Sequence, residues 1–225
     1  MSDLLDSDFL ARPLKVSEIF FSLQGEASRV GLPTVFIRLA GCPLRCRWCD
    51  TEYAFSDGAW MTVAEILSAV RAYPTRHVCL TGGEPLAQKE CLTLLAILCD
   101  QGYAVSLETS GALPIHEVDA RVARIVDLKP PSSGETEKNH WDNLIRITPA
   151  DEIKIVIADR EDYEWVSAIL KEKPELALLG CPIWLSPAYN RQDARELADW
   201  ILADGLPVRL QLQLHKTLWG NMRGK

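Results

Sequence analysis

The stretch VFIRLAGCPLRCRWCDT, residues 35–51, joins a short apolar run to a loop with three cysteines. Residues 35–40 predict a buried strand, because they are rich in β-forming side chains and a glycine follows them. Cys42, Cys46 and Cys49 come next in the pattern CxxxCxxC. Cysteines this close together let one loop wrap around a single metal centre. The stretch therefore predicts a strand whose carboxyl end carries a metal site.

Outward from this stretch, strand-like and helix-like runs alternate. Strands are predicted over residues 35–40, 77–82, 104–111, 124–130, 152–158, 182–187 and 208–214. Apolar residues recur at helical spacing over residues 62–73, 89–102, 162–173 and 191–205. This alternation favours right-handed βαβ units on a parallel sheet, with too few strands for a full eightfold barrel. We expect an α/β fold, an incomplete (β/α)6-type partial barrel, in one domain over residues 1–225.

Four motifs stand where predicted strands end, namely GCPLRC, TGGEP, ETSG and LKPPSSG. Functional residues of such folds gather at the carboxyl ends of the strands, so these motifs are expected to lie together. Residues 129–151 form a long polar stretch with two adjacent prolines. A loop of this length inside a compact domain is usually functional or mobile.

Composition narrows the classes of function. The net charge is −7 and the pI is near 5.2, so no overall positive field attracts nucleic acid, and direct binding is not expected. The N-terminus carries aspartates where a signal peptide would carry lysines, and no apolar run approaches the roughly 18 residues of a membrane span. A cytoplasmic protein without membrane contact is expected.

The remaining four cysteines, Cys79, Cys91, Cys99 and Cys181, are scattered. An odd total of seven in a chain without a secretion signal argues for thiols and metal ligands, not for disulfides. Unpaired cysteine is among the most buried residue types, so we expect these four to pack as small apolar side chains.

The three clustered cysteines leave a choice of metal. Structural zinc takes four ligands, usually from two separated pairs, and the four histidines are isolated from one another. Three thiolates on a cluster of four irons and four sulfurs would instead leave one iron free to bind a small molecule. That spacing resembles the radical S-adenosylmethionine superfamily, in which the amino and carboxylate groups of S-adenosylmethionine chelate the open iron of a [4Fe-4S] cluster.

The resemblance implies a division of tasks. One electron from the cluster cleaves the sulfonium, and the resulting 5′-deoxyadenosyl radical abstracts a hydrogen atom. TGGEP, residues 81–85, looks like the superfamily's glycine-rich motif, in which backbone approaches the amino group of the cofactor. Trp48 is expected beside the adenine, and ETSG, residues 108–111, beside the cofactor or its ribose.

From IFFSLQGEASRVGLPTVFIRLAGCPLRCRWCDT to LQLHKTLWGNMRGK the chain is also similar to the 7-carboxy-7-deazaguanine synthase family. That family converts 6-carboxy-5,6,7,8-tetrahydropterin into 7-carboxy-7-deazaguanine with loss of ammonia, on the way to queuosine and other deazapurines. LQGE, residues 23–26, is then expected to pair with the amide edge of the pterin. Arg38, in an otherwise apolar strand, would bind the substrate carboxylate, unless a protein acid holds it.

The resemblance assigns the site residues as follows. The cluster ligands are Cys42, Cys46 and Cys49, and Thr51 resembles the position that binds Mg²⁺. Cofactor contacts fall on Trp48, Cys49, Asp50, Gly83, Glu108, Ser110, Asp127, Leu128, Lys129 and the segment Ser186 to Tyr189. Substrate contacts fall on Leu23, Gln24, Gly25, Glu26, Arg38, Thr81 and His215.

The chain departs from the family pattern at two places. WGNMRGK continues beyond His215 and Lys216, where some members end with a carboxylate near the substrate. Asp127, Leu128 and Lys129 stand where many members carry Ser-Pro-Lys. The resemblance further implies a homodimer and a reducing partner such as flavodoxin. A glycyl-radical activase and a non-catalytic iron-sulfur or zinc module remain alternatives.

Overall fold

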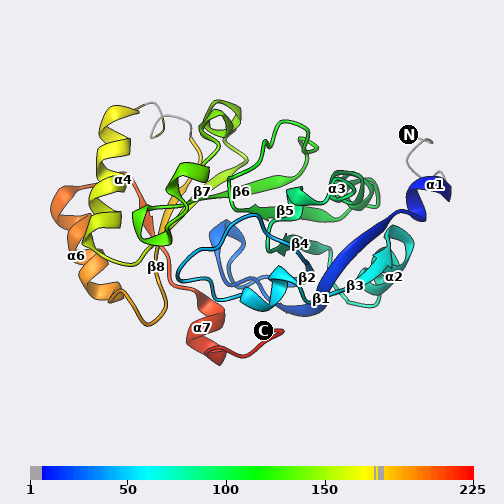
Figure 1. Ribbon diagram of the computed structural model, residues 1–225. Coiled ribbons are helices and arrows are strands. Elements are labelled where there is room, and N and C mark those ends of the chain that lie inside the picture. Colours follow the sequence, from blue (N-terminus) through cyan, green and yellow to red (C-terminus); the bar gives the residue numbers. More distant parts are fainter. Residues whose placement is uncertain (1–6, 175, 177–179) are drawn as a thin grey trace.

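A single curved sheet runs through the computed structural model, which describes residues 7–174, 176 and 180–225 (Figure 1). In this described part the sheet has nine strands in the order β3-β1-β2-β4-β5-β6-β7-β8-β9. From β2 onward neighbouring strands are parallel, and β1 pairs antiparallel with β2 and β3. The strands are β1 (Pro13–Leu23), β2 (Pro33–Leu39), β3 (Ala59–Thr62), β4 (His77–Gly82), β5 (Ala104–Thr109), β6 (Ala123–Leu128), β7 (Glu152–Ile157), β8 (Ile183–Pro187) and β9 (Arg209–Leu210).

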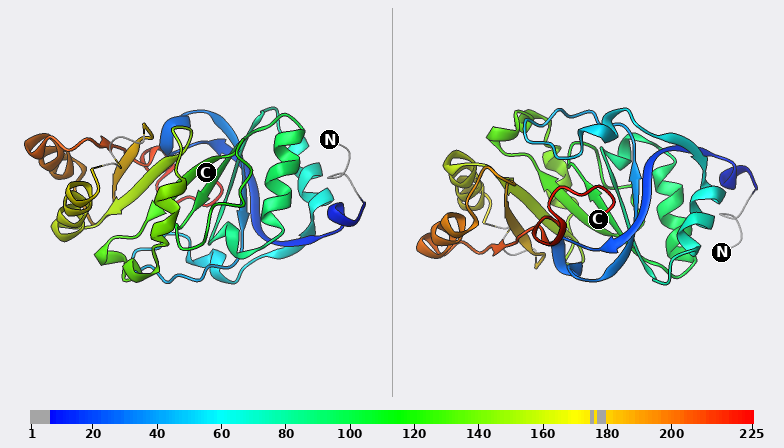
Figure 2. Two further views of the ribbon diagram at one scale, coloured as in Figure 1. Left: turned by 90° about the horizontal axis from the view of Figure 1, so that it is seen from above. Right: turned by 90° about the horizontal axis from the view of Figure 1, so that it is seen from below.

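The four predicted helices form close to the predicted bounds. They are α2 (Val63–Arg71), α3 (Cys91–Asp100), α4 (Arg160–Glu172) and α6 (Ala194–Asp204), and the short α1 (Ser7–Leu10) and α7 (Leu214–Trp219) lie near the two ends of the chain. Local signals set their ends: Thr62 and Glu65 form a capping box, and Gly205 ends α6 at a φ of 57°. α3 lies against β5, α4 against β7 and α6 against β8, so these helices cover the outer face of the sheet (Figure 2).

Strands β1 and β3 were not predicted. β1 mixes Lys15, Glu18 and serines with apolar residues and is mostly half-buried, so it lacks the continuous apolar run that marked the parallel strands. Of the run at 208–214 only Arg209 and Leu210 form a strand, β9, and α7 begins at Leu214. Residues 129–151 include three short 3-10 helices, Pro131–Ser133, Thr136–Lys138 and Trp141–Arg146, in place of an α-helix. The expected partial barrel is confirmed, with an antiparallel edge added.

Side chains along each parallel strand point alternately into the core under the helices and toward the concave face of the sheet. On β2, Val35, Ile37 and Leu39 are fully buried in the core under the helices. The intervening residues of each strand face the concave side instead, because side chains of a strand alternate between its faces. This concave set includes Phe36, Arg38, Thr81, Glu108, Ile125, Asp127, Lys154 and Val156.

No helix among the described residues is both long enough and apolar enough to cross a lipid bilayer.

Candidate active site

A cavity of about 530 Å³ occupies the concave side, a size typical of small-molecule sites. Strands β2, β4, β5, β6 and β7 supply its floor, and the cysteine loop supplies one wall. The C-terminal segment, residues 213–225, supplies another wall and crosses in front of the sheet in the right-hand view of Figure 2. Residues from both ends of the chain thus meet in one chamber.

Cys42, Cys46 and Cys49 all line this cavity and are free thiols. Burial raises the pKa of each thiol, that of Cys46 to about 11, so a bound metal must displace their protons. Among the described residues no three His, Cys, Asp or Glu side chains stand close enough to hold one metal ion. A four-iron cluster is larger than one ion and separates its thiolate ligands more widely, so three cavity-facing thiols in one loop suit a cluster.

The glycines of TGGEP bring two loops into backbone contact. A Cβ on Gly83 would stand 2.3 Å from the carbonyl oxygen of Gly41, and one on Gly82 would stand 2.4 Å from that of Leu39. The backbone N–H groups of Gly83 and Glu84 donate to the carbonyl oxygens of Leu39 and Gly41, at 3.1 and 2.8 Å. The glycines therefore fix the cysteine loop against β4, in addition to the cofactor contact expected of Gly83.

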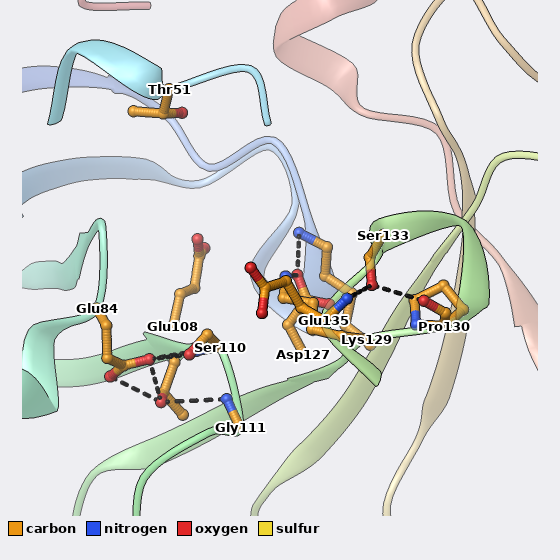
Figure 3. Close-up of polar contacts among 12 residues, drawn as sticks. Thr51, Glu84, Glu108, Ser110, Gly111, Asp127, Lys129, Pro130, Ser133 and Glu135 are labelled. Atoms are coloured by element: carbon orange, nitrogen blue, oxygen red, sulfur yellow. Dashed lines mark hydrogen bonds and ion pairs between the residues drawn. The ribbon is translucent and has the colours of Figure 1, made fainter. Parts of the chain in front are cut away.

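Glu84 ties TGGEP to ETSG. This carboxylate is fully buried and accepts hydrogen bonds from Thr109 Oγ1 at 2.9 Å, from the backbone N–H of Ser110 at 2.6 Å and from the Ser110 hydroxyl (Figure 3). It also accepts from the backbone N–H of Leu86 at 2.9 Å. Sequence reasoning assigned Ser110 to the cofactor and gave Glu84 no role, although a glutamate between glycine and proline at a strand end was a usable signal.

On the opposite wall Lys129 lies over the ring of Trp48, with Nζ 5.3 Å from the centroid, and pairs with Asp127 at 3.1 Å. Figure 3 shows Asp127 and Lys129 side by side at the end of β6. Burial disfavours the charge of Lys129, but Asp127 outweighs it and the pKa is raised. Asp127 Oδ1 is buried and has no hydrogen-bond partner in the described part of the chain. A buried acceptor that lacks a protein donor at the cavity surface can accept a hydrogen bond from a polar ligand.

The predicted substrate residues Gln24, Glu26 and Thr81 also come together. Gln24 Nε2 and Thr81 Oγ1 both donate to Glu108 at 3.2 Å. Glu108 thus lies with residues assigned to the substrate, although it was itself assigned to the cofactor. Burial and the nearby Glu26 raise the pKa of Glu108. Burial opposes ionisation of Glu26 too, but Lys154 and a 2.7 Å hydrogen bond from Gln213 lower its pKa.

Lys154 was missed. It forms an ion pair with Glu26 and lies 3.8 Å from Asp127, its register partner on β6. The sequence did mark this residue in the way it marked Arg38, because Lys154 is the one basic residue of the mainly apolar strand EIKIVI.

Arg38 lines the cavity but is already partnered. Its Nε donates to Glu18 at 2.8 Å, and Glu18 also accepts from Tyr53 at 2.8 Å and from Arg223 at 3.2 Å. A protein carboxylate, Glu18, therefore holds Nε of Arg38. A substrate carboxylate would have to bind the other guanidinium nitrogens.

Asp50 and Thr51 form a hydrogen-bonded pair at the cavity. The Thr51 hydroxyl donates to Asp50 Oδ1 at 2.8 Å, and Asp50 Oδ2 pairs with Lys216 at 3.0 Å. The cavity walls partly desolvate Asp50, whose side chain is still 48% exposed, but Lys216 and Thr51 outweigh this effect and lower its pKa to about 2. In Figure 3 Thr51 lies on a loop apart from the labelled residues of β5 and β6.

The C-terminal extension folds back over the cavity instead of leaving it. A Cβ on Gly25 would stand 2.1 Å from His215 Nδ1, so only glycine allows this contact. Arg223 reaches Glu18 and lies 3.9 Å over the ring of Tyr53. Arg223, Gly224 and Lys225 thereby line the cavity.

Four further assigned residues differ in how they can reach a ligand. Leu128 packs its side chain in the core under the helices, so only its backbone can reach a ligand. The Ser186 hydroxyl is buried without a hydrogen-bond partner in the described ranges, and Tyr189 lines the cavity with Lys216 Nζ 5.4 Å from its ring. Leu23 also lines the cavity, at the end of β1.

The class follows from comparison with known proteins. The family model of the radical SAM superfamily matches residues 36–131, which hold the cysteine loop, TGGEP and ETSG. The crystal structure of QueE from Escherichia coli aligns over 95% of this chain and 99% of its own, with a TM-score of 0.74 and 25% sequence identity. This is the architecture of a radical S-adenosylmethionine enzyme, with its [4Fe-4S] cluster and cofactor.

Relatives narrow the class to one family. The 7-carboxy-7-deazaguanine synthase of Chlorobaculum tepidum is 46% identical, over 92% of this chain and 94% of the relative. The 7-carboxy-7-deazaguanine synthase of Koribacter versatilis is 42% identical, over 92% of this chain and 97% of the relative. The chain belongs to the 7-carboxy-7-deazaguanine synthase family, which decides against the activase and the non-catalytic module.

Proposed function

We propose that this protein converts 6-carboxy-5,6,7,8-tetrahydropterin into 7-carboxy-7-deazaguanine with release of ammonia. One observation carries the proposal: the three cysteines and the cluster of Gln24, Glu26 and Glu108 line the same cavity. The first group suits a redox cluster, and the second suits a flat heterocycle rich in donors and acceptors. A cavity that holds both can bring a cofactor-derived radical to such a ring.

The residues divide the cavity between two ligands. Cys42, Cys46 and Cys49 would hold the [4Fe-4S] cluster, and S-adenosylmethionine would lie between Gly83 and the wall of Trp48, Asp127 and Lys129. When bound, the reduced cluster and S-adenosylmethionine supply the radical that removes a hydrogen atom from the substrate. The Trp48 ring packs near Val156 and Ala188, an apolar surface suited to a purine. Lys129 and Asp127 Oδ1, which has no hydrogen-bond partner within the described ranges, add polar contacts beside it.

The substrate would occupy the end of the cavity near β1 and β5. Glu26, ionised by its partner Lys154, accepts from ring N–H and amino groups, and Gln24 and Thr81 hold Glu108 beside it. His215 closes this end over Gly25, and burial lowers the pKa of its imidazole, which favours the neutral form. The neutral ring can then donate from one nitrogen and accept at the other.

Anaerobic turnover tests the proposal. The reconstituted, reduced enzyme with S-adenosylmethionine and 6-carboxy-5,6,7,8-tetrahydropterin should develop the absorbance of the deazaguanine. Cleavage of S-adenosylmethionine without loss of the pterin would refute the assignment of substrate while leaving the class intact.

We further propose that Mg²⁺ binds at Thr51. Its hydroxyl donates to Asp50, which leaves the oxygen lone pairs for a cation, and Mg²⁺ keeps several waters and needs few protein oxygens. A divalent cation here would hold the substrate and offset negative charge that develops during ring rearrangement.

Replacement of Thr51 tests the metal. Turnover by the wild type should rise about threefold to tenfold with added Mg²⁺. Thr51→Ala should lose this dependence and keep its iron, whereas Thr51→Ser should retain most of it because the hydroxyl remains. Wild-type turnover that is indifferent to both a chelator and Mg²⁺ would remove the site and leave Asp50 and Thr51 as a hydrogen-bonded turn.

Two partners complete the proposal. A homodimer and a one-electron donor such as flavodoxin follow from the resemblance, and sedimentation together with reduction by purified flavodoxin would test them.

A further inference from the structure

Lys154 is a buried cation on β7, in the floor of the cavity. It is only 9% exposed, and every residue of its strand, β7, is buried. A lone ammonium in such a place is costly unless it is paired. Burial disfavours its charge, but Glu26, Asp127 and Glu108 outweigh this effect and raise its pKa, so Lys154 is charged.

Its partners belong to the two halves of the site. Glu26 follows β1 in the segment proposed to bind the pterin, and Asp127 ends β6 beside Lys129 and Trp48. The Glu26 carboxylate is held from a second side by Gln213 Nε2 at 2.7 Å. Each oxygen of the Glu26 carboxylate can accept two hydrogen bonds, so each can still accept one from a ligand after the contacts with Lys154 and Gln213.

Glu26 and Glu108 are neighbouring buried carboxyl groups in unlike surroundings. Glu26 has the cation, whereas Glu108 accepts from the neutral donors Gln24, Thr81 and Cys79. Burial and Glu26 raise the pKa of Glu108, while Lys154 holds that of Glu26 down. Two adjacent carboxyl groups whose pKa values are driven apart present a fixed acceptor next to a group that can carry a proton.

We propose that Lys154 is a positioning residue for the substrate, which holds Glu26 as an ionised acceptor facing the N–H and amino groups of the pterin. This inference rests on the proposed function. Lys154 acts through Glu26 and does not itself contact the ring. Without it the acceptor would be lost by protonation, and affinity for the pterin would depend on pH.

The charged groups around Glu26 come from several elements. Lys154 on β7, Glu108 on β5, Asp127 and Lys129 at the end of β6, and Arg38 on β2 line the same cavity. His215 on α7 lines it too and lies close enough to Glu26 for their charges to interact. Since burial lowers the pKa of His215, its imidazole stays neutral from about pH 7 to about pH 9. In that interval a change in pterin affinity reports on the carboxyl groups.

The experiment measures anaerobic binding of 6-carboxy-5,6,7,8-tetrahydropterin by equilibrium dialysis to cluster-loaded enzyme with S-adenosylmethionine and no reductant, so that the ligand is not turned over. The wild type should bind with nearly constant affinity from about pH 7 to about pH 9. Lys154→Met should bind about tenfold to a hundredfold more weakly at about pH 7 and recover toward about pH 9, as the unpaired Glu26 ionises. Lys171→Met, at an exposed lysine of α4, is the matched control and should behave as the wild type.

A double-mutant cycle separates positioning from direct contact. Glu26→Gln should weaken binding at every pH, and adding Lys154→Met to it should change little, because Lys154 acts through Glu26. Should Lys154→Met not fold, Lys154→Gln, which removes the charge but keeps a hydrogen-bonding group, carries the same expectation.

Unchanged binding by Lys154→Met, or a loss that is constant with pH and adds to that of Glu26→Gln, would overturn the inference. Neither result would affect the turnover of carboxytetrahydropterin by the wild type, on which the proposed function depends. A wild type that neither binds nor turns over 6-carboxy-5,6,7,8-tetrahydropterin would overturn both.

Discussion

Replacing Cys46 by alanine is expected to abolish cleavage of S-adenosylmethionine. The three thiols share one loop and line one cavity, so a cluster held by them has no substitute ligand nearby: among the described residues the other cysteines lie in or against the helix-side core or under Glu108. After anaerobic reconstitution the wild type should hold about four irons per chain. Its paramagnetic signal should change when S-adenosylmethionine is added, because one iron lacks a protein ligand. The variant should hold little iron and form no methionine.

Cys91→Ala is the matched control for this experiment. Cys91 is fully buried, whereas Cys46 is half-buried, and it packs at the start of α3, so its loss should cost about 1 kcal/mol of stability and leave the iron content unchanged. Stoichiometric zinc in the wild type, or full iron in Cys46→Ala, would contradict the assignment.

Replacing Glu84 by alanine is expected to give the largest loss of stability. The carboxylate is fully buried and accepts from Thr109, from the backbone and hydroxyl of Ser110, and from the backbone of Leu86. Its removal leaves several buried donors unpaired, which should cost about 3 to 5 kcal/mol and lower the Tm by about 10 °C. Because Glu84 joins the loops after β4 and β5, binding of S-adenosylmethionine should weaken as well.

Thermal unfolding and denaturant titration would measure this effect. Glu137→Ala, at an exposed glutamate of the loop after β6, should leave the Tm unchanged within error. Glu84→Gln keeps one acceptor oxygen, so its Tm should lie between that of Glu84→Ala and that of Glu137→Ala. A Tm of Glu84→Ala equal to that of the wild type would show that the two loops are held together without this carboxylate.

Much of the fold was open to prediction because the parallel strands are buried on both faces. Runs such as HVCLTG and EIKIVI are almost wholly buried, and such strands read as continuous apolar segments. Strand β1, which lies between β3 and β2, is half-buried, so its mixture of polar and apolar residues did not mark it as a strand. The expectation of one domain over residues 1–225 stays a prediction.

The site was predictable where short motifs carry it, and less so where partners come from distant segments. The cysteine loop and LQGE line the cavity as expected. Lys154 was missed because its role depends on Glu26, far away in the chain. Glu18 was missed because β1, which places it opposite Arg38, was not predicted. The return of Arg223 to Glu18 depends on how the C-terminal segment folds, which no local pattern encodes.

The central claim is that this cavity directs a radical to a carboxytetrahydropterin and contracts its ring. Ammonia release by the reduced, reconstituted enzyme tests it most directly, because cofactor cleavage alone forms no ammonia. With 6-carboxy-5,6,7,8-tetrahydropterin and S-adenosylmethionine present, ammonia and 7-carboxy-7-deazaguanine should appear in equal amounts, and omission of either compound should abolish both. Sustained formation of methionine and 5′-deoxyadenosine with the pterin intact and no ammonia would contradict the claim.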